Sequence, residues 1–361
     1  VLPVLRNLVC SILASRMYKA IKDNPEVMDK EQAAFLPGSE TMSSVATLYE
    51  QCQRRSIGQK ITIIVSVDVE QAYASVRMRI LMVLLRRHGF DDTFIDQIMV
   101  IMEKKKWNLV LPTINNLQEF THMAGLPEGD PCSPILYNIY TNGLFKTLTH
   151  SIEIPIGEMA EHIETKGGRF ADDVYLLQET ARRAAKAVHE LIQAYTKLGL
   201  KVEPSKSQIL IVFPKEVIES ISSLKVEQAD KNKRYQDLAM KVLNKIYRNE
   251  KGYEEIKKMT LVNSMRYLGI ELHWTWDLVK IASLTRNKRR WGASQHLNLI
   301  EDPYITCFTK MVIIKSYIFP KLNYGSELLG NHAKKTAKNF INKALKKACI
   351  ETTKSHTTVH T

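Results

Sequence analysis

Two adjacent carboxylates, Asp172 and Asp173, lie inside an apolar segment with the composition of a β-hairpin, and a third, Asp68, ends a β-branched run at 61–67. Neighbouring carboxylates in apolar surroundings repel each other and lose hydration, so a bound cation stabilises them. Mg²⁺ prefers oxygen ligands and is typically held by a few carboxylates together with substrate phosphates. Two such ions about 4 Å apart activate a hydroxyl and neutralise a leaving pyrophosphate, which is the chemistry of nucleotide addition.

The same residue types have a second interpretation, because Asp is common in turns and at helix N-caps. Asp91 and Asp92 are an example: they follow Gly89 and precede residues with helical spacing, so capping accounts for them. Strand-like residues flank Asp172-Asp173 on both sides, which favours the metal-binding interpretation. From the residues alone, a simple turn stays open.

Hydrophobic periodicity predicts the elements that position these carboxylates. We expect helices over residues 4–24, 41–55, 76–88, 92–104, 133–147 and 180–199, strands over 61–68, 208–213 and 266–272, and a hairpin over 170–177. Residues 214–262 are expected to be helical and charged, and the remainder mostly helical. This order predicts an α+β fold in which helices pack on one face of an antiparallel sheet.

The charge distribution points to a polyanionic partner. The 361 residues carry a net charge of +13. Residues 1–200 hold 22 Lys and Arg against 23 Asp and Glu, whereas residues 201–361 hold 29 against 15. A basic part joined to a near-neutral one favours nucleic acid as the partner, although a solvated basic surface has the same composition.

Basic side chains of the C-terminal part form three groups that suit a phosphate backbone. On a helix expected over 231–250, apolar residues (Tyr235, Leu238, Val242, Leu243 and Ile246) share one face, and basic residues (Arg234, Lys241, Lys245 and Arg248) share another. The second group is the run 286–291. The third consists of Lys334, Lys335, Lys338, Lys343, Lys346 and Lys347.

The five cysteines are scattered and form no C-x-x-C pair, which argues against a disulfide framework or a zinc site and fits a reducing compartment. No apolar run approaches the roughly 20 residues of a membrane span, so we expect no membrane association. We expect an intracellular protein, cytoplasmic and also nuclear if eukaryotic, that is not secreted. The chain begins Val-Leu-Pro, which we interpret as a fragment of a longer polyprotein.

Seven segments, in order, resemble reverse transcriptases of LINE-type (non-LTR) retrotransposons and their group II intron relatives. They are residues 32–38, 68–73, 125–134, 170–173, 199–206, 267–269 and 324–330. The resemblance implies a right-hand polymerase palm with partial fingers at 1–60, a palm at 61–275 that carries a helical insertion at about 214–262, and a basic helical thumb and C-terminal segment at 276–361. It implies an RNA-templated DNA polymerase of a retroelement.

The resemblance also implies roles for individual residues. Asp68, Asp172, Asp173 and the backbone of Val69 would hold two Mg²⁺ ions, with Mn²⁺ as a possible substitute. Tyr73 would exclude the ribose 2′-hydroxyl, and Lys206 would act as the general acid for pyrophosphate. Val69, Gly129 and Phe170 would also bind the nucleotide. Contacts with template and primer would come from Gly125, Pro127, Tyr267, Leu268, Gly269, Arg286, Lys288, Arg289 and Arg290.

The implied partners are an RNA template, a DNA primer and deoxynucleotides, while the oligomeric state is open.

Two residues depart from the family pattern: Ala74 stands where the family has Asp, and Glu128 where it has Gln. We also expect the family's N-terminal finger strands to be missing or degenerate before Val1. Together with these departures, that expectation leaves open a catalytically inactive remnant that binds nucleic acid. A third alternative, an RNA-dependent RNA polymerase, shares the palm carboxylates, but Tyr73 argues against it.

Overall fold

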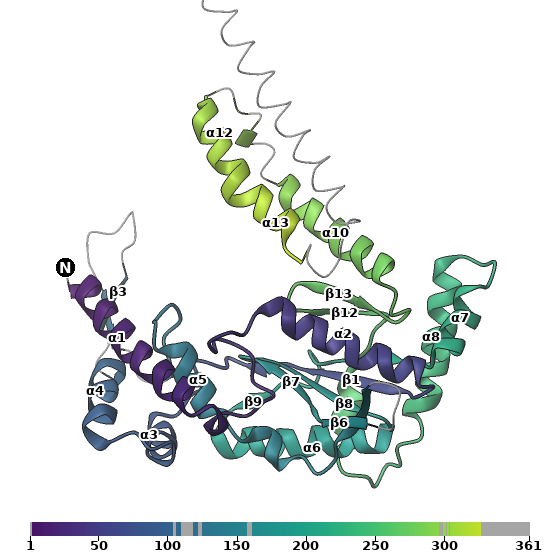
Figure 1. Ribbon diagram of the computed structural model, residues 1–361, viewed down its shortest axis with the longest axis horizontal. Helices are drawn as coiled ribbons and strands as arrows, with labels where there is room; N and C mark the ends of the chain where they lie inside the picture. The colour runs from purple at the N-terminus through teal and green to yellow at the C-terminus, as the bar shows by residue number, and fades with distance from the viewer. Residues whose placement is uncertain are drawn as a thin grey trace, which may run out of the picture. The chain divides into compact units, whose positions relative to one another are not determined.

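The computed structural model describes residues 2–103, 106–109, 118–121, 125–156, 161–295, 299–300, 302 and 304–325 (Figure 1). The chain forms two compact units, Val1–Val262 and Asn263–Thr361. The functional division expected at residues 60 and 275 stays a prediction.

A five-stranded sheet forms the centre of the first unit. Its strands are β1 (Thr62–Val67), β7 (Gly167–Phe170), β8 (Asp173–Gln178), β10 (Gln208–Val212) and β11 (Thr260–Leu261), in the order β11-β10-β1-β8-β7. All neighbours are antiparallel except β10 and β11. The β-branched run predicted as a buried strand is β1, and Ile63, Ile64 and Val65 are fully buried because both faces of the sheet are covered.

Helices cover both faces of the sheet (Figure 1). Helix α6 (Ala181–Leu198) packs on β8 and β1 with the predicted apolar stripe, which includes Ala184, Val188 and Leu191. Helix α2 (Thr41–Ile57) lies on the opposite face, where Arg55 Nε donates to Thr62 Oγ1 at 2.9 Å. The predicted α+β fold with a mainly antiparallel sheet is confirmed. Helices were expected on one face of the sheet, and α2 adds a layer on the other face.

Further elements surround this centre. Helices α1 (Leu2–Asp23), α3 (Met78–Arg87) and α4 (Asp92–Glu103) lie close to their expected positions, and η1 (Pro25–Val27) follows α1. The helix expected over 133–147 is instead α5 (Ser133–Tyr140) followed by the 3-10 turn η2 (Leu144–Thr147). Gly143 separates them because its φ of +85° is not helical. The hairpins β3–β4 (Lys106–Leu109 and Gln118–Thr121) and β5–β6 (Ile152–Ile156 and Glu161–Thr165) were not predicted.

The insertion forms helices α7 (Lys215–Ser222), α8 (Gln228–Leu243) and α9 (Tyr253–Lys258). Within α8 the predicted two-sided character is confirmed, since Tyr235 is buried whereas Arg234 and Lys241 are exposed. The helix expected to reach residue 250 ends at Leu243, so Lys245, Ile246 and Arg248 lie in the turns that follow it. The Tyr235 hydroxyl accepts a hydrogen bond from the backbone N–H of Ile211 at 2.9 Å, which attaches α8 to β10.

The second unit begins with a hairpin, β12 (Ser264–Tyr267) and β13 (Ile270–His273). The single strand expected over 266–272 is therefore wrong, because Leu268 and Gly269 form a turn with φ of +44° and +79°. Helices α10 (Leu278–Ser294), α12 (Cys307–Ile313) and α13 (Phe319–Asn323) follow, and the π-helix η3 (Ile314–Ile318) joins the last two. The lysines expected as a stripe at 334–347 lie outside the described residues. None of the described helices combines the length and apolar character needed to cross a membrane.

Candidate active site

The three carboxylates predicted to act together are brought to one edge of the sheet. In the antiparallel pairing of β1 with β8, Val67 is opposite Val174, so the next step of the register sets Asp68 level with Asp173. Asp172 occupies the turn between β7 and β8, where Phe170 pairs with Asp173. Strand pairing therefore gathers side chains that are about a hundred positions apart in the sequence.

The environment of these carboxylates suits a divalent cation. Asp68, Asp172 and Asp173 are all exposed, and no described Lys or Arg forms an ion pair with Asp68 or Asp172. Among the described residues, the ligand atoms of Cys10, Asp130 and Cys132 all lie within 4.8 Å of one another. The carboxylate oxygens of Asp68, Asp172 and Asp173 are farther apart than this. Exposed carboxylates at the end of a sheet keep the rotamer freedom to close on an ion.

Asp68 is held by the segment that contains Lys206. The backbone N–H of Asp68 donates to Ser207 Oγ at 3.1 Å, and the N–H of Glu203 donates to the carbonyl oxygen of Asp68 at 2.9 Å. The short strands β2 (Val69–Glu70) and β9 (Lys201–Val202) continue this pairing. Lys206 lies in the intervening turn with an exposed side chain, one residue from the group that anchors Asp68.

Tyr73 lies beside Asp172 in a cluster of aromatic rings. Its ring stacks on Tyr137 of α5, with centroids 4.7 Å apart. Burial, with a further contribution from the Asp172 carboxylate, raises the pKa of Tyr73 to about 12. The Tyr73 hydroxyl is therefore neutral at physiological pH, and the ring presents a fixed wall next to the carboxylates.

The loop after residue 124 docks directly on the Tyr73 turn. The N–H of Leu126 donates to the carbonyl oxygen of Tyr73 at 2.7 Å. Gly125 has a φ of +80°, and a Cβ there would lie 2.3 Å from the carbonyl oxygen of Ala74. This close backbone approach requires glycine. Pro127 is buried and accepts a hydrogen bond from Ser133 Oγ at 2.6 Å, whereas Glu128 and Gly129 are exposed at the tip.

Gln32 begins the first of the seven family-like segments, and its side chain supports the turn that carries Asp172. Its Oε1 accepts hydrogen bonds from the backbone N–H groups of Ala34 and Ala171, at 3.0 and 3.2 Å. Segment 31–33 also pairs with Arg169, which donates its N–H to the carbonyl oxygen of Glu31 at 2.8 Å. The segment thus extends the sheet beyond β7 and supports the turn that carries Asp172.

Arg169 is a supporting residue that the sequence did not indicate. Its side chain is 1% exposed and bonds Asp29 at 3.3 Å and the carbonyl oxygen of Thr141 at 2.7 Å. Asp29 lies 140 positions away in the sequence, so no local pattern marks the pair. Together they fix the strand that leads into Phe170, whose ring lies 6.2 Å from that of Phe35.

The Cys10–Asp130–Cys132 group does not fit a magnesium ion. Arg6 bonds the Asp130 carboxylate at 2.5 Å, and the N–H of Cys132 donates to its other oxygen at 2.9 Å. Burial, with the neighbouring Cys10 and Asp130, raises the pKa of the Cys132 thiol to about 12, so the thiol keeps its proton. Mg²⁺ also prefers oxygen ligands. We assign this group to packing of α1 against the 125–133 loop.

In the second unit, the residues predicted to contact the primer form a connected structure of their own. Tyr267, Leu268 and Gly269 end β12 and make the hairpin turn, whose Leu268 carbonyl accepts a hydrogen bond from the Tyr324 hydroxyl at 2.8 Å. Arg289 bonds the Gly269 carbonyl oxygen at 2.8 Å.

The other basic residues predicted here belong to α10. Lys288 pairs with the buried Glu271 at 2.8 Å, and Arg286 is half-buried. The side chain of Arg290 lies outside the described residues. Lys288 and Arg289 therefore hold α10 to the hairpin, and their contact with nucleic acid stays a prediction.

The chain is similar in sequence to several known proteins. Residues 3–272 match the family described as "Reverse transcriptase (RNA-dependent DNA polymerase)". The chain is 28% identical over 197 residues to the Pol polyprotein of the type-2 retrotransposable element R2DM of Drosophila melanogaster, covering 54% of this chain and 18% of that protein. It is 24% identical over 294 residues to the Pol polyprotein of the type-1 retrotransposable element R2 of Popillia japonica, covering 80% and 42%.

A telomerase structure from Candida albicans aligns with 93% of the chain and 47% of its own length, at 11% identity and a TM-score of 0.39. The chain spans less than half the length of the two R2 polyproteins. The family model covers most of the chain, including the sheet, the three carboxylates and the β12–β13 hairpin. The chain belongs to the reverse transcriptase family.

Proposed function

We propose that this chain is the polymerase part of a retroelement protein and extends a DNA primer with deoxynucleotides on an RNA template. The observation that carries the proposal is the register of β1 and β8, which sets Asp68 level with Asp173 beside the Asp172 turn. An RNA template, a DNA primer and deoxynucleotides are the corresponding partners. The R2 relatives support the retroelement context.

Asp68, Asp172, Asp173 and the backbone carbonyl of Val69 would hold two Mg²⁺ ions, or Mn²⁺ in their place. Bound there, the ions would lower the pKa of the primer hydroxyl and neutralise charge on the leaving pyrophosphate. The protein supplies the placement: β1 and β8 fix two carboxylates, and the Gln32 contact fixes the turn that presents the third.

Tyr73 and Lys206 would act on the nucleotide. The Tyr73 ring is fixed by stacking on Tyr137 and by docking of Leu126, so it can exclude a 2′-hydroxyl by its position. Lys206 lies in the turn that anchors Asp68, and its exposed ammonium would donate a proton to pyrophosphate as the bond to the α-phosphate breaks. Phe170 and Gly129 would line the same nucleotide site.

The test is primer extension on an RNA template with the full 361-residue chain. Extension should occur with Mg²⁺ or Mn²⁺ and fall below detection in Asp172→Asn. Asp237→Asn, an exposed position on α8, controls for the loss of a negative charge. Ribonucleotides should extend the primer poorly, which separates the proposal from an RNA-dependent RNA polymerase.

One observation favours a second candidate, a nucleic-acid-binding remnant without turnover. Glu128 places a carboxylate at the exposed tip of the loop that would face template or nucleotide, where it repels phosphates. A folded sample that binds a template–primer hybrid in a salt-dependent manner, yet extends it with neither metal ion, would establish this candidate and overturn the first.

A further inference from the structure

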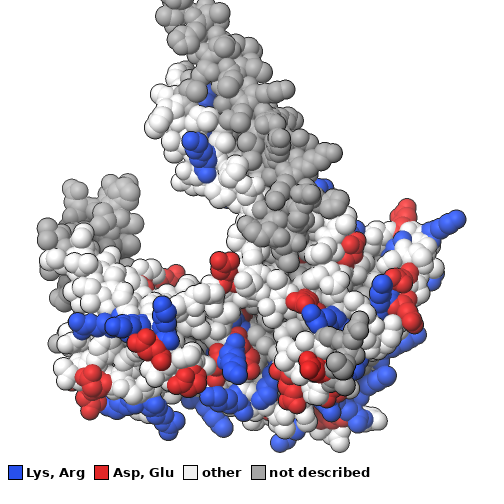
Figure 2. Space-filling model, viewed as in Figure 1, with Lys and Arg blue, Asp and Glu red and all other residues white. Residues whose placement is uncertain are grey.

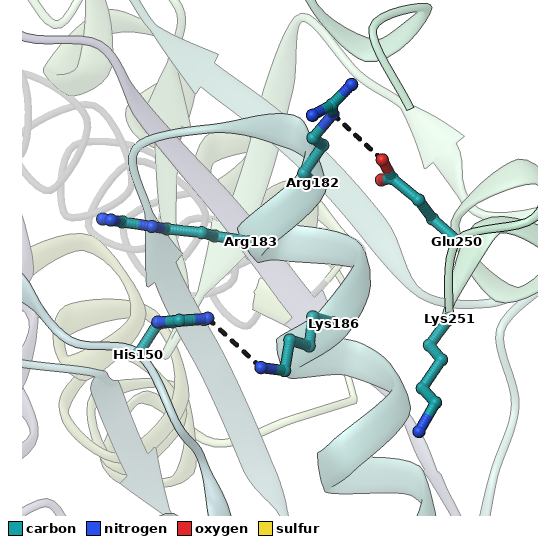
Figure 3. A pocket seen from close by; sticks show the side chains of 6 residues that line it. All are labelled: His150, Arg182, Arg183, Lys186, Glu250 and Lys251. Atoms are coloured by element: carbon teal, nitrogen blue, oxygen red, sulfur yellow. Dashed lines mark hydrogen bonds and ion pairs between the residues drawn. The ribbon is translucent and has the colours of Figure 1, made fainter. Parts of the chain in front are cut away.

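A basic pocket lies on the first unit away from the carboxylates. It has a volume of about 250 Å³ and is lined by His150, Arg182, Arg183, Lys186, Glu250 and Lys251 (Figure 3). Three of these residues belong to the first turns of α6, and two belong to the loop that follows α8 in the insertion. The sequence predicted only a charged helical surface for the insertion. The structure shows that the insertion also contributes two residues to the lining of this pocket.

The pocket lies at the opposite end of α6 from the active site. The 18-residue helix is about 27 Å long, and its C-terminal end leads into β9, next to Asp68. Strand β8 also runs from Asp173 to Gln178, a distance of about 17 Å, before α6 begins. A ligand in the pocket thus lies well outside the nucleotide site.

The charges of the lining favour an anion. Four Lys and Arg side chains and one carboxylate, Glu250, line the pocket. Three of the cations already form ion pairs, Arg182 with Glu250, Arg183 with Glu179 and Lys186 with Glu190, so the remaining excess of positive charge comes from Lys251. The positive end of the α6 dipole adds to this, because Arg182, Arg183 and Lys186 all lie in its first two turns. Lys251 forms no ion pair with any described residue and is exposed, so its ammonium is available to a ligand.

Arg182 and Lys186 are held in place before any ligand binds. Arg182 bonds Glu250 at 2.9 Å, and its guanidinium lies over the Tyr247 ring, 4.2 Å from the centroid. Lys186 Nζ lies 3.4 Å from His150 Nε2, and the His150 backbone is attached to β8 by the Gln178 side chain at 3.2 Å. Fixed donors lose little conformational entropy on binding.

We propose that this pocket binds the phosphodiester backbone of a nucleic-acid strand at a second site, outside the polymerase cleft. The lining contains no Phe, Tyr or Trp, and its one imidazole, His150, already contacts Lys186, so the lining favours recognition of phosphate over reading of bases. Lys245 of the insertion lies next to the pocket, because its carbonyl oxygen accepts a hydrogen bond from Arg182 Nε at 3.4 Å, and its side chain is exposed. Figure 2 shows Lys and Arg side chains over the α6 and α8 region, with acidic residues between them.

The experiment measures the binding of a labelled 20-nucleotide single strand by fluorescence anisotropy, with one molar equivalent of an unlabelled short template–primer hybrid to occupy the cleft without competing in excess for the pocket. The Lys186→Gln/Lys251→Gln double variant removes two pocket cations. Its affinity for the strand should fall about tenfold at moderate salt, and the slope of log K against log salt should decrease by about 2. Lys22→Gln/Lys30→Gln, two exposed lysines outside the pocket, makes the same change in net charge and should leave both values unchanged.

Three further measurements distinguish a nucleic-acid strand from free phosphate as the ligand and separate this proposal from the polymerase assignment. RNA and DNA strands of one sequence should bind alike, because the lining contacts phosphate alone. Millimolar inorganic phosphate should displace the strand only weakly, since a single phosphate releases fewer counterions. Extension of the short hybrid should be equal in wild type and double variant, so that failure here is distinct from failure of the polymerase assignment. No second-site binding in the wild type, or equal losses in the two double variants, would overturn the proposal.

Discussion

The side-chain oxygen of Gln32 accepts a hydrogen bond from the backbone N–H of Ala171, 139 positions later in the chain. Ala171 precedes Asp172 directly and has a φ of +58°, a conformation that costs free energy for a residue with a Cβ. The same oxygen also bonds the N–H of Ala34, so one buried amide joins the N-terminal segment to the turn of the carboxylates. The turn is therefore supported from outside the sheet that contains it.

Gln32→Leu replaces the amide with an apolar side chain of similar size and leaves both backbone N–H groups without an acceptor. Each orphaned buried donor costs about 1–3 kcal/mol, so the free energy of unfolding should fall by about 2 kcal/mol or more. Primer extension should fall further than stability alone explains, because the Asp172 turn loses its support. Gln53→Leu, at an exposed position of α2, is the matched control. Denaturant unfolding and single-turnover extension measure the two effects, and wild-type extension by folded Gln32→Leu would contradict this role.

Gly125 and Gly129 form a matched pair for the docking of the loop on the Tyr73 turn. Both have a positive φ, of +80° and +77°, so alanine at either position costs about 1 kcal/mol of backbone strain. A Cβ at Gly125 meets the Ala74 carbonyl oxygen at 2.3 Å, whereas a Cβ at Gly129 meets nothing within 4 Å. Gly125→Ala should therefore lose about 2 kcal/mol more stability than Gly129→Ala. Thermal unfolding of the two variants decides, and equal losses would show that the loop is not tightly docked.

The sequence predicted those parts of the site that depend on local pattern. A continuous run of β-branched residues marks β1, and the apolar residues around Asp172-Asp173 mark a hairpin, so a site that combines Asp68 with Asp172 and Asp173 could be expected. Helix α6 was predicted to within a residue or two because its N-cap, Thr180, and its terminal Gly199 are both standard signals.

The parts that the sequence did not predict depend on distant partners. In the sequence, Arg169 has no feature that distinguishes it from other strand residues. Its charge can be buried because it pairs with Asp29, which is far away in the sequence. The hairpin β5–β6 carries charged residues such as Glu153 and Glu164, which hide its strand character. The pocket joins α6 to a loop of the insertion, and no motif connects those two segments.

Tyr195 and Tyr235 are both buried, but their hydroxyl groups differ in hydrogen bonding. The Tyr195 hydroxyl is buried with no hydrogen-bond partner among the described residues, whereas that of Tyr235 accepts the N–H of Ile211. Tyr195→Phe should leave the free energy of unfolding at pH 7 unchanged or slightly raised, since it removes an unsatisfied group. Tyr235→Phe should lower it by about 1–3 kcal/mol, because the Ile211 N–H loses its acceptor. Urea unfolding of both variants checks the contrast, and the reverse order would refute it.

Tyr195 also predicts a pH dependence. Burial, opposed by Arg169 and assisted by Asp172, raises the pKa of Tyr195 to about 12, whereas an unfolded chain has a value of about 10. Above pH 10 the unfolded state loses this proton first, so the stability that is present below pH 10 decreases as the pH rises toward 12. Tyr195→Phe removes one such group, and its stability should decrease less steeply over that range. Parallel curves for the variant and wild type would show that Tyr195 does not hold its proton more tightly when folded.

Tyr73 tests whether the fixed ring selects the sugar. Tyr73→Ala removes the ring that stacks on Tyr137 and opens the space beside Asp172, so ribonucleotide incorporation should rise by at least tenfold relative to deoxynucleotide. Tyr73→Phe keeps the ring and removes only the hydroxyl. Its selectivity should stay within about threefold of wild type, because exclusion depends on the position of the ring. Competition between the two nucleotides in single-turnover extension measures the ratio. Relaxed selectivity in Tyr73→Phe would assign the discrimination to a hydrogen bond of the hydroxyl, and unchanged selectivity in Tyr73→Ala would remove Tyr73 from the nucleotide site.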